Sequence, residues 1–227
     1  MKTLRLLACL ILLTFASQIA KGQEDYRFDI GGGFGMTGYL GDANKSNLWK
    51  NPGWDFQALL RYIINPRFGL KTNVYVGSLR GDTSTMTDVL PDNANFKFST
   101  TFYEVGELFE FNFFNFGIGE TYRKLKRFSP YITAGVSATI WTVDSKTGVA
   151  FTMPVGCGVK FKINRRMNLG LEFLMKKTFT DRLDGDNLKD PYGIKSDFMK
   201  NTDWYSTFTV TLSYEFSKRC AVCNYKD

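Results

Sequence analysis

The chain has 227 residues, of which 29 are lysine or arginine, 22 are aspartate or glutamate and none is histidine. Without histidine it cannot build a Ser-His or Asp-His hydrolase, a His-ligated zinc or haem site, or imidazole acid–base catalysis. The formal net charge of +7 is too modest to indicate a nucleic-acid-binding protein.

The first 22 residues have the features of a secretory signal peptide. Two basic residues precede an apolar run at 6–15, and Ala20-Lys21-Gly22 forms a small-residue cleavage site before Gln23. The apolar run is too short to span a bilayer as a helix. We therefore expect a cleaved signal peptide at 1–22. Its three basic residues leave with it, which lowers the formal net charge from +7 to +4.

The remainder of the chain alternates apolar and polar residues with period two. In one segment Trp54 and Phe56 fall on one side and Asp55 and Gln57 fall on the other. Successive side chains of a β-strand point to opposite faces, so this alternation predicts strands with one apolar face. Eight such segments occur: 27–37, 54–62, 68–79, 102–113, 131–143, one on each side of the turn at 164–166, and 204–216.

The connections between these segments alternate in length. Asn65-Pro66-Arg67 and Asn164-Arg165-Arg166 predict tight turns, and the polar stretches at 41–53, 80–99 and 180–203 predict long loops. A shorter turn is expected at 144–148. Each strand is long enough to cross a membrane when tilted, and alternating loops and turns are typical of outer-membrane barrels.

These observations predict an all-β protein: an eight-stranded antiparallel up-and-down transmembrane β-barrel of the OmpA/OmpX type, with its interior filled by side chains. The barrel should occupy residues 23–216 and sit in the outer membrane. Because the strand count is even, both ends of the strand series should lie in the periplasm. A periplasmic tail with a C-x-x-C sequence should follow at 217–227.

The polar faces of the strands predict a charge network inside the barrel. Lipid cannot solvate charge, so the apolar faces should point outward and the charged faces inward. An interior set with five bases and five acids favours structural ion pairs over the alternative, a proton or ion path. The predicted network consists of Arg27, Asp29, Asp55, Arg61, Lys71, Glu104, Glu110, Lys160, Glu172 and Lys176.

Glu107 departs from this pattern because it falls on the apolar face of its strand, between Val105 and Phe109. A charged side chain on the lipid face near the membrane centre destabilises a barrel, by about 2–4 kcal/mol for the least favourable residue types. We favour a β-bulge that turns Glu107 inward. The alternatives are a protein partner that covers it and a carboxyl group tolerated in place.

The expected periplasmic side carries a basic surface and a cysteine pair. The basic turns suit either phospholipid headgroups or an acidic periplasmic partner. Cys220-Ala221-Val222-Cys223 has too few ligands for zinc, which leaves a local disulfide or a disulfide to another protein. The candidate docking residues are Cys220, Cys223, Arg123, Lys124, Lys126, Arg127, Lys218 and Arg219.

Several stretches carry a family resemblance: "INPRFGLKTNVYVGSLRGD", "YEVGELFEFNFF", "FSPYITAGV", "PVGCGVKFKINRRMNLGLEFLMKKTFTDRLD" and "NTDWYSTFTVTLSYEFSKRC". Together they resemble the PorG family of outer-membrane barrels in the type IX secretion system of Bacteroidota. The resemblance implies an accessory component that associates with a periplasmic ring made of a lipoprotein and its partner. That machine exports proteins with a C-terminal sorting domain and supports gliding motility in gliding species.

The resemblance supplies no catalytic, cofactor-binding or metal-binding residues, so we expect a protein that is not an enzyme and uses no cofactor. Its expected partners are the outer-membrane bilayer and the periplasmic ring, with no nucleic acid and no small-molecule substrate. The main alternative is a stand-alone OmpX-like surface protein that binds ligands or host structures through loops at 41–53, 80–100 and 180–203. A barrel enzyme is disfavoured because histidine is absent.

Overall fold

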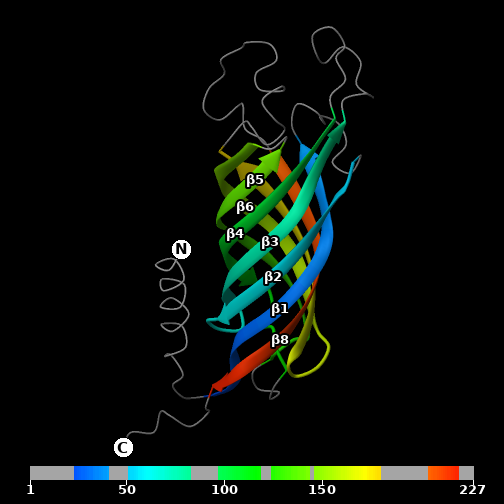
Figure 1. Cartoon of the computed structure of the whole chain (residues 1–227). Helices are drawn as coiled ribbons and strands as arrows, with labels where there is room; N and C mark the ends of the chain where they lie inside the picture. Colours follow the sequence, from blue (N-terminus) through cyan, green and yellow to red (C-terminus); the bar gives the residue numbers. More distant parts are fainter. Residues whose placement is uncertain are drawn as a thin grey trace, which may run out of the picture.

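Eight antiparallel strands close into a single barrel in which each strand pairs with its neighbours in sequence and β1 pairs with β8 (Figure 1). This computed structural model describes residues 23–40, 51–82, 97–118, 124–143, 146–179 and 204–219. The predicted up-and-down barrel is confirmed. Its strands are β1 (Gln23–Leu40), β2 (Gly53–Ile63), β3 (Phe68–Asp82), β4 (Lys97–Asn112), β5 (Phe128–Val143), β6 (Lys146–Lys162), β7 (Met167–Thr178) and β8 (Trp204–Arg219).

The two ends of the barrel differ in their connections. At the terminal end, where β1 begins and β8 ends, the described residues 64–67 and 163–166 form tight turns. At the other end, which we call the loop end, residues 41–50, 83–96, 144–145 and 180–203 join the strands and lie outside the described part of the chain. No described helix is long and apolar enough to cross a membrane.

Most strands extend further than the apolar–polar alternation predicts. Arg80 pairs with Ser99 inside the stretch expected to be a loop, and β6 begins at Lys146 inside the expected turn at 144–148. The ladder continues there because backbone hydrogen bonds do not require an apolar face. At the terminal end β8 runs to Arg219, which pairs with Gln23, so residues 217–219 of the expected tail belong to the strand.

The outer face of the barrel is apolar, as its alternation predicts. Along β2 buried and exposed residues alternate at every step from Gly53 to Tyr62. Phe34 and Phe56, two of the outward side chains, are 65% and 60% exposed. Aromatic rings on this face contact one another across strands: the Phe28 and Tyr62 ring centroids lie 5.4 Å apart. Such a surface cannot face water over its whole height, and it is the surface that lipid requires.

Buried apolar side chains fill much of the interior toward the loop end. Phe102 and Tyr205 bring their ring centroids to 5.5 Å, and both side chains are fully buried. Inward positions on β3, β4, β5 and β7 add further large groups. The cluster, which we call the aromatic cluster, consists of Tyr75, Leu79, Phe102, Leu108, Trp141, Ala150, Leu174 and Tyr205.

Glycines on the inner face of β1 allow β8 to approach closely. A Cβ atom at Gly33 would lie 2.6 Å from the carbonyl oxygen of Val210 and 2.8 Å from a methyl group of Thr211. At Gly32, which points outward, the nearest atom would be 3.5 Å away. The space that glycine leaves on the inner face is therefore already occupied.

We expect Gly33→Ala to destabilise the barrel by about 1–3 kcal/mol, because the added methyl group overpacks the β1–β8 seam. Gly32→Ala adds the same methyl group to the open outer face and should change stability by about 0.5 kcal/mol or less. Urea unfolding of the protein in lipid vesicles, followed by tryptophan fluorescence, measures both. Equal losses for the two variants would contradict the close approach.

Candidate functional site

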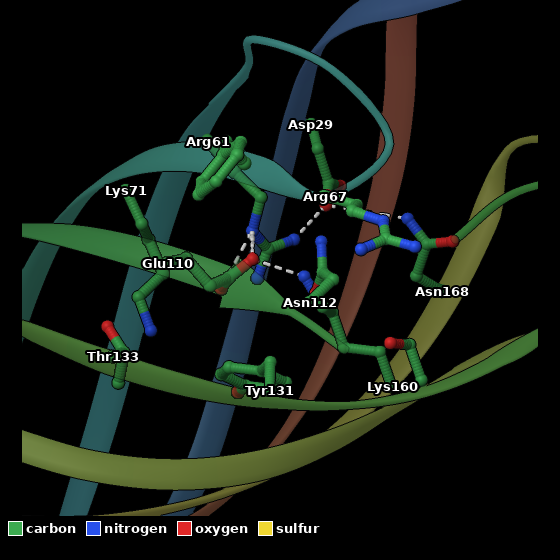
Figure 2. A network of polar contacts seen from close by, with 12 residues as sticks. Asp29, Arg61, Arg67, Lys71, Glu110, Asn112, Tyr131, Thr133, Lys160 and Asn168 are labelled. Carbon is green, nitrogen blue, oxygen red and sulfur yellow. Dashed lines mark hydrogen bonds and ion pairs between the residues drawn. The ribbon is translucent and has the colours of Figure 1, made fainter. Parts of the chain in front are cut away.

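A network of buried ion pairs occupies the interior near the terminal end. Arg61 on β2 lies between two carboxylates: it pairs with Asp29 on β1, and its Nε lies 3.2 Å from a carboxylate oxygen of Glu110 on β4 (Figure 2). Lys160 on β6 pairs with Glu110 from the other side. All four side chains are at least 93% buried, so the charges depend on one another for solvation.

A second group of polar contacts lies at the middle of the barrel. Lys71 on β3 forms an ion pair with Glu172 on β7, across the interior. Tyr131 donates a hydrogen bond of 2.8 Å to Glu172 Oε2, and the Tyr75 hydroxyl lies 3.4 Å from Oε1. Glu172 therefore accepts from two strands, β3 and β5, and joins them to β7.

Glu104 forms the third group, next to the aromatic cluster. Lys176 Nζ lies 2.7 Å from Glu104 Oε2, and the Tyr205 hydroxyl donates to the same oxygen at 2.7 Å. The Lys176 ammonium also lies 3.6 Å from the centroid of the Tyr75 ring, a cation–π contact. The network thus continues from β1 to β8 without an unpaired lysine among these positions.

Two of the predicted network residues have a different environment. Asp55 is buried and accepts a hydrogen bond of 3.0 Å from Thr209 Oγ1, but it has no ion pair with another described residue. Arg27 lies in β1 with intermediate burial and likewise forms no ion pair within the described segments. The other eight predicted residues form the three groups above.

The structure adds an ion pair that sequence reasoning missed. Lys162 Nζ lies 2.5 Å from Glu215 Oε1, and the amide nitrogen of Asn168 donates to the same oxygen at 2.9 Å. Lys162 was overlooked because it adjoins a turn, and Glu215 because it lies between two aromatic residues. Lys162 shares the period-two face of Lys160, a predicted interior residue, and Glu215 shares the face of Ser213, which is buried. That parity was the available signal.

The described part of the connection between β4 and β5 packs against the terminal end of the interior. Phe116 forms an isolated bridge with Lys126, and Lys126 N donates to Asn115 O at 2.7 Å. The ammonium groups of Lys160 and Lys162 lie 5.4 and 5.2 Å from the centroid of the Phe116 ring. Since both lysines are interior residues, Phe116 covers the interior network from below.

Hydrogen bonds hold this connection to the neighbouring turns. Arg67 Nε donates to Asn115 Oδ1 at 2.8 Å, and Phe116 N donates to Pro66 O at 3.2 Å. On the other side Lys162 N donates to Arg127 O at 2.7 Å. The described part of the connection is therefore anchored to the barrel at several points.

Exposed basic side chains surround the anchored connection. We call this set the terminal rim, and within the described residues no exposed acidic side chain lies among them. The terminal rim consists of Arg67, Lys124, Lys126, Arg127, Arg165 and Arg166.

Arg166 of the terminal rim is held by two side-chain hydrogen bonds. Its Nη1 and Nε donate hydrogen bonds of 2.8 and 2.7 Å to the hydroxyls of Tyr214 and Tyr26. These hydrogen bonds raise the pKa of its guanidinium above the ordinary value, with the larger effect from Tyr214. The group therefore keeps its positive charge at every physiological pH.

The predicted docking residues fall partly on this rim. Lys124, Lys126 and Arg127 are exposed members of it. Lys218 and Arg219 lie at the end of β8, and their side chains are not described. The remaining three, Arg123, Cys220 and Cys223, lie outside the described segments.

Glu107 remains on the outer face, and the predicted β-bulge is wrong. Glu107 pairs with Thr72 on β3 and Val136 on β5 in ladders that run without interruption on either side of it. A regular ladder keeps the face of every residue. Thr72 Oγ1 donates a hydrogen bond of 2.7 Å to Glu107 Oε2, so an outward hydroxyl, rather than inward rotation, provides the carboxylate with a partner.

The described residues do not bring metal-ligand side chains together. No group of three or more histidine, cysteine, aspartate or glutamate side chains that could hold a metal ion occurs within them. The acidic side chains of the interior are instead engaged with lysine, arginine, tyrosine or threonine. The arrangement can support a rigid, filled barrel that presents one strongly basic end.

We expect Lys71→Met to destabilise the barrel by about 3–5 kcal/mol, because Glu172 is then buried without its cation. Adding Glu172→Gln should recover more than half of the loss, since the amide oxygen still accepts from Tyr131 without carrying charge. Urea midpoints in lipid vesicles measure both variants. Arg165→Met on the exposed rim is the control, with an expected change of about 0.5 kcal/mol or less. Additive losses in the double variant would contradict a coupled pair.

Solved structures of outer-membrane barrels share this fold. Neisserial surface protein A is 12% identical, with a TM-score of 0.52, and the alignment covers 83% of this chain and 97% of that chain. The outer membrane protein OprG from Pseudomonas aeruginosa is also 12% identical, with a TM-score of 0.48 and coverage of 86% and 98%. The fold comparison rests on the first of these. No curated protein matches the sequence.

The fold is thus a closed eight-stranded barrel of the outer-membrane type, whose apolar outer face suits a lipid bilayer. A family model described as "Domain of unknown function (DUF6089)" matches residues 4–225, nearly the whole sequence. The chain therefore belongs to the DUF6089 family.

Proposed function

We propose that this protein is a non-catalytic outer-membrane component of a protein secretion machine and is similar to PorG of the type IX secretion system. In this role the protein docks a periplasmic ring complex. The observation that carries the proposal is the terminal rim. Six exposed basic side chains gather at one end of the barrel, and no exposed acidic side chain lies among them in the described residues. A surface of one charge favours association with a partner of the opposite charge.

The rim faces the periplasm in this proposal. Outer-membrane barrels have short turns on the periplasmic side and longer loops outside, and the tight turns at 64–67 and 163–166 lie at the terminal end. The tail after β8 then also lies in the periplasm, in reach of the same partner. Export would depend on the signal peptide expected at 1–22.

A filled interior supports a role as an anchor rather than a channel. The aromatic cluster occupies the interior toward the loop end, and Phe116 covers it at the terminal end. Between them the charges are paired across the barrel. Eight strands leave space that side chains can fill, so exported proteins would have to pass elsewhere in the machine.

The anchored β4–β5 connection suits docking because its backbone is already ordered. In its described part, hydrogen bonds with Pro66, Arg67 and Lys162 fix the positions from which the basic side chains extend. A partner that binds such a surface loses less conformational entropy than one that must order a free loop. The terminal rim is therefore a preorganised basic surface.

Charge reversal on the terminal rim should weaken the complex without unfolding the barrel. We expect Lys124→Glu combined with Arg127→Glu to reduce the periplasmic ring lipoprotein that co-purifies after gentle detergent extraction by roughly tenfold, through the loss of opposite-charge contacts. Quantitative mass spectrometry of the tagged protein measures this. Both side chains are exposed, so the barrel should retain its stability.

Arg80→Glu is the matched control, because Arg80 is an exposed base at the opposite end of the barrel. It should leave co-purification unchanged. Normal ring recovery and normal secretion with the reversed rim would refute the docking role. A folded barrel that purifies alone, and whose activity is lost when the loops at 41–53, 80–100 and 180–203 are shortened, would instead support the stand-alone surface protein.

The two tail cysteines provide a separate test. If a disulfide joins the tail to the ring, non-reducing gels should show a high-mass band that dithiothreitol removes and that Cys220→Ser with Cys223→Ser abolishes. Cys157, an exposed free cysteine on the outer face of β6, is the control, and Cys157→Ser should leave the band in place. A wild-type protein that runs only as a monomer with an internal disulfide would assign the pair a local role.

A further inference from the structure

The outer face of the barrel contains one charged side chain away from the strand ends, within the part of the chain that the structure describes. That residue is Glu107, flanked along β4 by Val105 and Phe109, which are 56% and 47% exposed. Its neighbour across the ladder on β5 is Val136, also exposed. The carboxylate therefore stands in an apolar surface that suits lipid.

A single hydrogen bond does not fully solvate this group. Thr72 donates to Oε2, and among the described residues no other donor contacts the carboxylate. A carboxylate has two oxygens and about four acceptor sites. Ionisable residues on membrane-facing surfaces are costly and uncommon, and those that persist are typically engaged with a partner.

Small outward residues lie near Glu107 on β5, and others lie two and three strands away on β2 and β1. Ladder pairs place Gly32 beside Ala58 on the outer face, and Ala138 beside Val105. Ala134 pairs with Phe109 one step further along β5. All of these small residues point outward and are exposed. Small residues let the backbone of a neighbouring membrane segment approach closely.

The opposite side of the barrel has no such surface. The described outward positions of β6, β7 and β8 carry mostly larger side chains, with Cys157 on β6 among the exceptions, and no charge occurs among them until Lys177, near the loop end of β7. These side chains include Phe151, Met153, Leu169, Leu171, Phe208 and Leu212. The polar group and the small residues thus coincide on β1 to β5.

We propose that this shallow face binds a membrane-embedded segment of another protein that presents a lysine or arginine side chain at the depth of Glu107. The face consists of Gly32, Ala58, Thr72, Glu107, Ala134 and Ala138. Charge complementarity selects the partner: a cation would occupy the acceptor sites that Thr72 leaves open, in surroundings where water cannot compete. This inference is independent of the terminal rim and of the periplasmic partner.

A second copy of this chain is a poorer match. Copies related by an axis along the membrane normal keep the same depth, so a symmetric contact through this face would bring a second Glu107 toward the first. Like charges at that distance repel strongly in a medium of low dielectric constant. A basic partner offsets the charge instead of doubling it.

Photo-crosslinking in the native cell tests the proposal. A benzophenone amino acid is placed at Ala138 on the shallow face and, as the matched control, at Leu171 on β7, which also points outward. We expect a protein adduct at Ala138 and none at Leu171. Mass spectrometry should map the crosslinked peptide to a membrane-spanning segment that contains lysine or arginine.

Variants at Glu107 test the role of the charge. Glu107→Leu should reduce the adduct roughly tenfold or more, and the folded barrel should still be recovered as a heat-modifiable band, because the change removes a polar group from the lipid face. Glu107→Lys should abolish the adduct, and replacing the mapped lysine or arginine of the partner with glutamate should restore it.

Several results would overturn the proposal. Three concern the crosslink itself: an adduct of equal yield at Leu171, an adduct with lipid only or no adduct at all, and an adduct with a second copy of the chain. Another is a protein adduct whose yield does not change in a folded Glu107→Leu variant. The last result would show that the shallow shape, and not the carboxylate, selects the partner. Loss of the folded band in Glu107→Leu would overturn it as well, since the group would then stabilise the barrel itself.

Discussion

The interior of an eight-stranded barrel leaves no water to solvate the polar faces of its strands, and the rest of the structure depends on this constraint. Most inward charges are paired with a counter-ion on another strand, as Lys71 is with Glu172 and Lys176 is with Glu104. A buried charge without a partner costs several kcal/mol, so these contacts also fix which strands face one another. The same pairs that neutralise the interior therefore hold strands that are far apart in sequence in one register.

Small residues and aromatic residues meet this constraint together. Glycines such as Gly33 bring β1 against β8, which leaves room elsewhere in the cross-section for long side chains such as Arg61. Where charges end, toward the loop end, Phe102 and Tyr205 fill the volume with rings. Tyr205 belongs to both regions, because its ring packs in the aromatic cluster and its hydroxyl donates to Glu104. The interior is thus continuous, with no boundary between an ionic and an apolar half.

Period-two alternation was sufficient to predict the strand number, the pairing of neighbours and the faces of residues such as Asp29 and Glu110, because lipid and a filled interior impose opposite requirements on adjacent positions. It could not predict strand ends, since hydrogen bonding continues beyond the apolar band, as at Lys146. It also could not show that Phe116 covers the interior, which depends on contacts outside any strand. The prediction of a bulge at Glu107 was wrong because it assumed that a charged residue on the lipid face must turn inward. The ladder is regular there, and the hydroxyl of Thr72 provides the polar contact.

A barrel with a filled interior can act on other molecules only through its ends and its outer face. Evolution of such a protein is therefore free to vary those surfaces while the interior pairs remain constrained by their mutual solvation. The terminal rim and the shallow face lie on different parts of the outside, one toward water and one toward lipid. Because the two surfaces share no side chain, the two proposed partners would not displace each other, and the barrel would then join a membrane-embedded protein to a periplasmic one. A rigid interior is what such a link requires, since a barrel that deformed under load would not hold the two partners in fixed positions.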